Sequence, residues 1–348
     1  MRIFKKSLIF IVLNIIVACS LNFLLTNNPR PFDLRLKEYT EEPCSVVALG
    51  HSLGKSGVVP EVFNDDNPGK MFNLCNGGLS LEDFGYLIRG MNERRHLDIV
   101  YLDMYFDYWR DPDDMYFVVD TLGLDILKEL PGNLKASYFA NVICKRNYNS
   151  VLFPYNFSAD TISSIPNNIK RKIDFYDCVI QDKNLIRQYH QKEDPTYAGC
   201  GFNSESQFKG QKCNYRTFNA EDVYEERIRE FDDIVKYCDE QNIRLICFIS
   251  ALPTGRLQNE NHDEIHNFFS DLCRSRDVEL YDMNYLKYEY LPRTAENYID
   301  ADGHMKCELA ERQTQLLKKI TLANDKTVFF EDNYSDILQG IADYQEKN

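Results

Sequence analysis

A serine, a pair of glycines and a histidine near two aspartates each follow an apolar run that is expected to be a β-strand. The serine is Ser52, in the tight sequence GHSLG, and the glycines belong to Asn76-Gly77-Gly78. The histidine is His304, which follows Asp300 and Asp302. Ligands of open α/β sheets bind at the carboxyl ends of the strands, so these groups are expected to share one edge. Together they are the parts of a serine hydrolase: a nucleophile, a base with an orienting carboxylate, and backbone donors for an oxyanion.

The elements that must position these groups are five short apolar runs separated by amphipathic segments. The runs cover residues 45–50, 71–75, 98–104, 244–250 and 278–282. The amphipathic segments cover residues 81–95, 220–241 with Asn219 as the expected N-cap, 263–276 and 306–320. Near-continuous apolar strands that alternate with helices are typical of a parallel sheet covered on both faces. The sequence therefore predicts an α/β fold.

The remaining segments suggest a division of the chain into parts. The stretch 105–218 interrupts the alternation and predicts a large insertion after the third strand, with helices near 115–130 and 133–147, forming a lid or subdomain over the strand ends. We expect a signal anchor or lipoprotein signal peptide at 1–26, a linker at 27–43, an α/β domain at 44–322 and an acidic tail at 323–348 with a short helix.

The N-terminus predicts a location outside the cytoplasmic membrane. Arg2, Lys5 and Lys6 precede an apolar run from Ser7 to Leu25, and basic residues stay on the cytoplasmic side. An uncleaved signal anchor is favoured because the run stays apolar beyond Cys19. The alternatives are a lipoprotein in which Cys19 is lipidated, a cleaved signal peptide and a buried helix.

Composition excludes some classes of protein. The 348 residues carry a formal net charge of −14, and we find no local basic stripe, so nucleic acid is not an expected partner. The 22 Tyr and 22 Phe argue against a wholly disordered chain. Of the 11 Cys, Cys200 and Cys213 are the expected disulfide pair, whereas Cys75 and Cys247 lie in strand-like runs and are expected to be buried thiols.

At these residues the chain resembles the SGNH (GDSL-like) hydrolase superfamily, in particular its membrane-anchored, extracytoplasmic members. VVALGHSLG resembles the first block of that family, which places the nucleophile at Ser52, with His51 where many members have Asp. FNLCNGGLS resembles the second block, which implies that Gly78 donates to the oxyanion and that Asn76 shapes the turn. DIVYLDMYFDYW occupies the third block but lacks its oxyanion Asn. The resemblance implies a doubly wound, flavodoxin-like sheet.

The last block of the family carries Asp three residues before the His. Here Ala301 has that position, and Asp300 and Asp302 lie on either side of it. A shift of one residue makes one of them the orienting acid. Asp300 is favoured because an aromatic residue, Tyr298, precedes it at the expected offset.

The resemblance and the expected location imply a serine esterase or O-acyltransferase that acts on acyl esters, with those of cell-envelope polysaccharide as the expected substrates, without a cofactor or metal. Expected partners are an acylated glycan or small ester and the membrane; the sequence leaves oligomeric state and acyl acceptor open. The alternative is a non-catalytic anchored protein that binds glycan or an envelope-assembly partner, which the missing oxyanion Asn favours.

A second group, His262 and His266, has the helical spacing of zinc proteases. Asp follows the first His, where zinc proteases need Glu, so a solvated helix face is expected.

Overall fold

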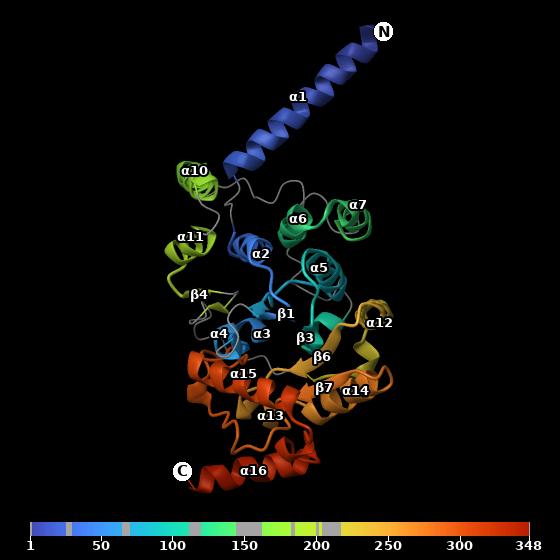
Figure 1. The fold of residues 1–348 in the computed structure, drawn as a ribbon, viewed down its shortest axis with the longest axis vertical. Coiled ribbons are helices and arrows are strands. Elements are labelled where there is room, and N and C mark those ends of the chain that lie inside the picture. Colours follow the sequence, from blue (N-terminus) through green and yellow to red (C-terminus); the bar gives the residue numbers. More distant parts are fainter. Residues whose placement is uncertain are drawn as a thin grey trace.

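A five-stranded parallel sheet forms the centre of the computed structural model, which describes residues 2–25, 30–64, 70–110, 120–143, 162–181, 185–199, 202–203 and 217–347 (Figure 1). The strands are β1 (Val46–Leu49), β2 (Met71–Asn73), β3 (Ile99–Asp103), β6 (Arg244–Ile249) and β7 (Glu279–Asp282). Their spatial order is β2-β1-β3-β6-β7 and all neighbours pair in parallel. All five predicted strands are confirmed, and the order is compatible with a doubly wound α/β fold.

Helices cover both faces of the sheet. Side chains on β1 alternate: Val47 and Leu49 belong to one hydrophobic cluster, and Val46 and Ala48 to another. The first cluster packs against α2 (Pro31–Glu41), α5 (Leu81–Arg94), α12 (Glu225–Glu240) and α14 (His262–Arg274). The second packs against α4 (Pro60–Asn64) and α15 (Cys307–Leu322). Because each face is buried, the strands are apolar along most of their length, and their polar residues lie at the strand ends.

Most predicted helices lie where the sequence indicates them, but α12 begins later than expected. Asn219 caps only a 3₁₀ turn, Ala220–Asp222, by accepting a hydrogen bond from the N–H of Glu221. The next residues then pair with another segment: Val223 forms an antiparallel bridge with Arg110, and the N–H of Tyr224 donates to Trp109 O at 2.9 Å. This pairing holds the chain extended, so the helix starts at Glu225.

The N-terminal segments consist of two helices. Helix α1 (Arg2–Leu25) contains, among the described residues, the one apolar stretch long enough to span a membrane, Phe4–Leu25 with a mean hydropathy of 2.6; it could act as an anchor or a signal sequence. The segment predicted as a linker holds α2, whose side chains Phe32, Arg35 and Tyr39 are buried. It packs against α6 (Asp120–Glu129) and α11 (Leu185–Glu193), so it belongs to the folded domain.

The described part of the insertion packs beside the helix layer, and part of it reaches the carboxyl ends of the strands, where Tyr105 stacks on His51. Its elements are the 3₁₀ helix η1 (Phe106–Trp109), α6, α7 (Gly132–Asn141), α10 (Ile165–Gln181), α11, β4 (Tyr197–Gly199) and β5 (Phe202–Asn203). Helix α6 contacts α2 and α5, α11 contacts α2, and β5 contacts α3 (Ser52–Gly57). The two helices predicted near 115–130 and 133–147 correspond to α6 and α7. Cys200 and Cys213 lie outside the described residues, whereas Cys75 and Cys247 are buried thiols, as predicted.

The acidic C-terminal segment ends in α16 (Tyr334–Lys347), at the opposite end of the molecule from the start of α1 (Figure 1). Ile337 and Ile341 are its buried side chains, and they join a hydrophobic cluster with Leu53 and Leu257. Leu257 lies on α13 (Thr254–Asn259). The tail therefore packs into the same hydrophobic cluster as Leu53, the residue that follows Ser52.

Candidate active site at the carboxyl ends of β1 and β3

The candidate site lies where the strand order of the sheet reverses. Strand β1 pairs with β2 on one side and with β3 on the other, so loops leaving β1 and β3 diverge at this point. Ser52 begins α3 directly after β1, and Asp103 ends β3. Open α/β sheets bind their ligands at such a reversal, outside the carboxyl ends of the strands. The topology thus places Ser52 at the preferred binding position of the fold.

Ser52, His304 and Asp300 form a continuous hydrogen-bonded series. Ser52 Oγ lies 3.0 Å from His304 Nε2, and His304 Nδ1 lies 2.7 Å from Asp300 Oδ2. His304 and Asp300 are buried, whereas Ser52 is half-exposed. The geometry brings together a hydroxyl, an imidazole and a carboxylate that are 252 and 4 residues apart in sequence. A hydroxyl in this arrangement can lose its proton to the imidazole as it attacks an electrophile.

The turn between Asp300 and His304 explains why Asp300 is the residue behind the imidazole. Asp300 Oδ1 accepts the backbone N–H groups of Gly303 and His304, each at 3.1 Å. Gly303 has φ +104°, a conformation that favours glycine, and it closes the turn. The carbonyl of Asp302 accepts from Arg256 at 2.7 Å, so its backbone is tied to another element. Of the two candidate acids, the structure therefore pairs Asp300 with His304.

Asp300 is held in its charged form. Burial raises the pKa of this carboxyl, but the hydrogen bond and charge of His304 and the two N–H donors lower it, and the net pKa lies below the usual range. A carboxylate at this position favours the tautomer of His304 that carries its proton on Nδ1. Nε2 then faces Ser52 Oγ as an acceptor, which is the arrangement that a general base needs.

The glycine turn after β2 lies beside Ser52. A Cβ on Gly77 would stand 3.7 Å from Ser52 Cβ, and Gly78 follows with φ +85°. Asn76 shapes this turn by donating from Nδ2 to Gly77 O at 2.8 Å. Arg35 on α2 braces it, because its guanidinium donates to Cys75 O and to Asn76 Oδ1. Arg35 is thus a supporting residue that comes from the segment predicted as a linker.

A second histidine contacts Ser52. His51 Nδ1 lies 3.0 Å from Ser52 Oγ, and the His51 ring stacks on Tyr105 with a centroid distance of 4.9 Å. One hydroxyl proton cannot serve two acceptors, so one imidazole accepts from Ser52 and the other donates to it. Because Asp300 fixes the proton on Nδ1 of His304, the accepting nitrogen is His304 Nε2 and His51 is the donor.

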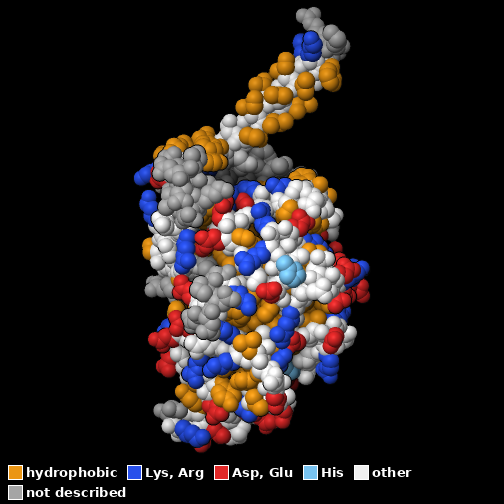
Figure 2. All heavy atoms as spheres, viewed as in Figure 1, with side chains coloured by type: hydrophobic (Ala, Val, Ile, Leu, Met, Phe, Trp, Pro, Cys, Tyr) orange, Lys and Arg blue, Asp and Glu red, His pale blue; other side chains and the backbone are white. Residues whose placement is uncertain are grey.

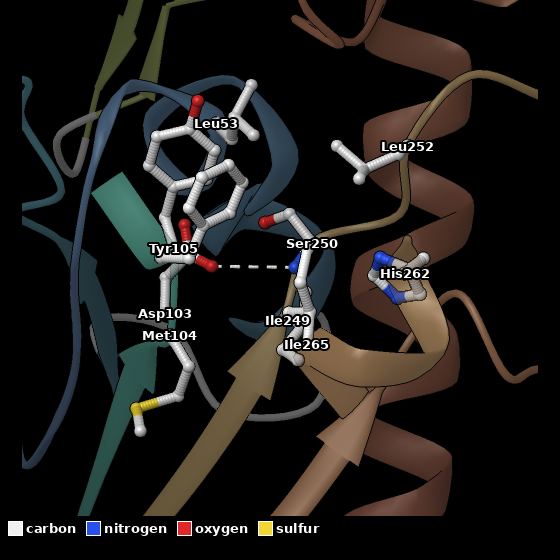
Figure 3. A pocket seen from close by; sticks show the side chains of 10 residues that line it. Leu53, Asp103, Met104, Tyr105, Ile249, Ser250, Leu252, His262 and Ile265 are labelled. Atoms are coloured by element: carbon white, nitrogen blue, oxygen red, sulfur yellow. Dashed lines mark hydrogen bonds between the residues drawn. The ribbon is translucent and has the colours of Figure 1, made fainter. Parts of the chain in front are cut away.

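Asp103 occupies the end of the strand where the expected oxyanion Asn is missing. Its Oδ2 accepts from the N–H of Gly54 at 3.0 Å, and its Oδ1 from the N–H of Ser250 at 3.4 Å. Asp103 is 1% exposed, and this burial raises its pKa to about 7, although these hydrogen bonds oppose the rise. Figure 3 shows it at the wall of a narrow, mainly apolar cavity, with its carboxyl directed at the backbone nitrogen of Ser250. The carboxyl therefore fastens α3 to the sheet.

His262 and His266 do not form the solvated helix face that the sequence suggests. His262 Nε2 and His266 Nδ1 each lie 3.0 Å from Asp282 Oδ2. His262 is buried, and His266 stacks on Tyr285 with a centroid distance of 3.6 Å. Their charges and hydrogen bonds hold the pKa of Asp282 well below its usual range despite burial, which raises it. The pair ties α14 to the end of β7. In the part of the chain that the structure describes, no group of three or more His, Cys, Asp or Glu could hold a metal ion.

Sequence reasoning missed three residues that support the site. Arg35 is polar within a polar segment, and nothing in the sequence links it to the glycine turn. Asp103 ends an apolar strand, which is the one sequence signal that marks it for inspection. The donor role of His51 depends on the orientation of its ring toward Ser52.

No protein-family model, no curated protein and no solved structure matches this chain.

Proposed function

We propose that this protein is a serine esterase or O-acyltransferase of the SGNH type, acting on acyl esters of cell-envelope polysaccharide. The observation that carries the proposal is the series Ser52–His304–Asp300, with contacts of 3.0 and 2.7 Å between its side chains. Its position at the reversal of the strand order supports the same function, because substrates of open α/β sheets bind there. The resemblance of the sequence blocks supplies the family and the substrate class.

In the proposed mechanism, Ser52 Oγ attacks the ester carbonyl carbon while His304 Nε2 takes the hydroxyl proton. Asp300 stabilises the imidazolium that forms. The tetrahedral intermediate then collapses, the bond to the alcohol oxygen breaks, and His304 returns the proton to that oxygen. In the second half, water or a sugar hydroxyl gives its proton to His304 and attacks the acyl group on Ser52. The acceptor decides between hydrolysis and transfer.

The oxyanion would be held by the N–H groups of Ser52 and Gly78. The N–H of Ser52 is the first of α3 and points out of the helix start, and the positive φ of Gly78 turns the backbone beside Ser52. The third block lacks the Asn, and the carboxyl of its Asp103 is buried and accepts from the N–H groups of Gly54 and Ser250. Loss of one oxyanion donor costs about 10²–10³ in rate in a serine protease, so we expect a slower enzyme than relatives with that Asn.

The membrane assignment rests on α1. An apolar helix of this length after a basic flank supports a domain held on the outer side of the cytoplasmic membrane, where envelope polysaccharide is accessible. This location agrees with an acyl ester of an envelope glycan as substrate. The proposed reaction needs no soluble cofactor.

The test is labelling of the full-length protein in detergent with a fluorophosphonate probe, which reacts with activated serines. We expect labelling of the wild type, and none of Ser52→Ala or His304→Ala. His51→Ala is the matched control, since His51 and His304 both lie 3.0 Å from Ser52 Oγ but only His304 is assigned the base. It should keep most of the labelling. A folded wild type without labelling would favour the non-catalytic alternative, and glycan binding would then be measured.

A further inference from the structure

The surface of α10 carries an apolar stripe that the proposed chemistry does not use. The stripe consists of Ile162, in the helical residues just before α10, and of Pro166, Ile169, Ile173 and Tyr176, which follow one another at intervals of four and three residues. This spacing places them on one face of a helix. Ile162, Ile173 and Tyr176 are 56%, 52% and 59% exposed. Burial of such a side chain stabilises by about 1.5–3 kcal/mol, so a continuous exposed stripe indicates a surface that is covered in use.

The stripe lies next to the end of the apolar helix α1. Asn168 Nδ2 donates to Leu24 O at 3.2 Å, and the ammonium group of Lys172 lies 5.1 Å from the ring centroid of Phe23. Both contacts join α10 to the last residues of α1, where a membrane span would end. Any bilayer that holds α1 therefore has its surface at the level of α10.

The orientation of α10 fits such a surface. In Figure 1 α10 is seen nearly along its axis while α1 runs across the view, so α10 crosses the direction of α1. Figure 2 shows hydrophobic side chains gathered beside the base of α1 over this helix. A helix that crosses a membrane span at its end lies in the plane of the bilayer surface.

We propose that α10 docks into the interface of the bilayer that α1 spans, with its apolar stripe among the lipid headgroups and upper acyl chains. Interfacial helices combine such a stripe with basic residues on the polar side, and here Lys170, beside the stripe, is exposed. Tyr176 adds an amphipathic ring of the kind enriched at membrane interfaces. The partner is a lipid surface. The inference rests on α1 as an anchor and is independent of the chemistry at Ser52.

The test uses tryptophan fluorescence of the full-length protein in proteoliposomes that contain brominated phosphatidylcholine, which quenches nearby indoles. Trp109, the single native Trp, is fully buried and gives a constant background. The test variant is Ile173→Trp. Phe10→Trp, in α1, reports insertion of the anchor. Leu338→Trp is the matched control, because Leu338 is exposed on α16, at the end of the molecule remote from α1.

We expect the added emission of Ile173→Trp to be quenched most by lipid brominated near the headgroup and less by lipid brominated at the chain ends. Phe10→Trp should be quenched by both, and Leu338→Trp by neither. The proposal is overturned if Phe10→Trp is quenched while Ile173→Trp responds only to aqueous iodide, as Leu338→Trp should. It is equally overturned if Ile173→Trp is protected from both lipid and iodide, since the stripe would then be covered by protein, such as a second copy of the chain.

Discussion

Replacement of Asp300 by Asn is the sharpest test of the assignment of the base. The carboxylate accepts the Nδ1–H of His304 at 2.7 Å, whereas an amide can present its NH₂ group there. The imidazole would then carry its proton on Nε2 and donate to Ser52 Oγ instead of accepting from it. The hydrogen-bond distances need not change in this variant. A loss of reactivity at Ser52 would therefore report the tautomer of His304 and the charge of residue 300, not a displaced side chain.

The magnitude can be estimated from this geometry. Two unit charges 2.7 Å apart at an effective dielectric constant of about 20 attract by about 6 kcal/mol, and this attraction stabilises the imidazolium that forms as Ser52 is deprotonated. Both groups are buried, so solvent screens it little. A change of 1.36 kcal/mol in the barrier is tenfold in rate, so this attraction corresponds to about 10⁴-fold. The same substitution in a serine protease triad lowers kcat by about 10⁴.

The assay is the second-order rate of fluorophosphonate labelling of the full-length protein, with circular dichroism to verify folding. Asp302→Asn is the matched control, because the structure gives its carbonyl, not its carboxylate, a partner in Arg256. We expect Asp300→Asn to lose about three to four orders of magnitude in rate and Asp302→Asn to label like the wild type. Wild-type labelling of a folded Asp300→Asn, or an equal loss in Asp302→Asn, would refute the reasoning.

Three further predictions concern the supports of the site. The pKa of Asp103 is raised to about 7, so the folded state binds more protons than the unfolded state between about pH 4 and 7. The free energy of unfolding should therefore fall as pH rises through that range. Denaturation of Asp103→Asn at several pH values should show a flatter pH profile than the wild type, and an unchanged slope would contradict this. Gly50→Ala places a Cβ against the Cβ of Asp103 and should lower the free energy of unfolding by about 1–3 kcal/mol, as measured by denaturation. An unchanged free energy of unfolding would contradict the close approach of the two residues. Arg35→Met removes the donor to Cys75 O and Asn76 Oδ1 at the glycine turn, so it should lower the free energy of unfolding by about 1–3 kcal/mol and slow labelling of Ser52. Unchanged labelling would show that the turn does not depend on Arg35.

The sheet could be predicted from sequence because its strands are buried on both faces. Such strands leave continuous apolar runs, and all five runs correspond to strands. The site could be located for a related reason: parallel strands bring their carboxyl ends to one edge, so Ser52 and His304 were expected together although 252 residues separate them. The choice between Asp300 and Asp302 was harder, because it depends on a turn closed by Gly303 at positive φ.

Polar residues inside the fold are the part that sequence reasoning could not place. Arg35 and His262 look like solvated side chains in a one-dimensional pattern, because burial of a polar group depends on partners from distant elements. Arg35 finds them at Cys75 and Asn76, and His262 finds its partner at Asp282. The late start of α12 has the same origin, since it depends on pairing between Val223 and Arg110.

The burial of α2 limits where α1 could be cut away from the rest of the chain. Proteolysis between α1 and α2, before Pro31, would release a domain that keeps Arg35 beneath the glycine turn. Cleavage only a dozen residues later, before the first strand, would remove α2 and leave Asn76 and Cys75 without their donor. Removal of α1 could therefore preserve or remove the support of the turn beside Ser52, depending on which of these two peptide segments a protease cuts.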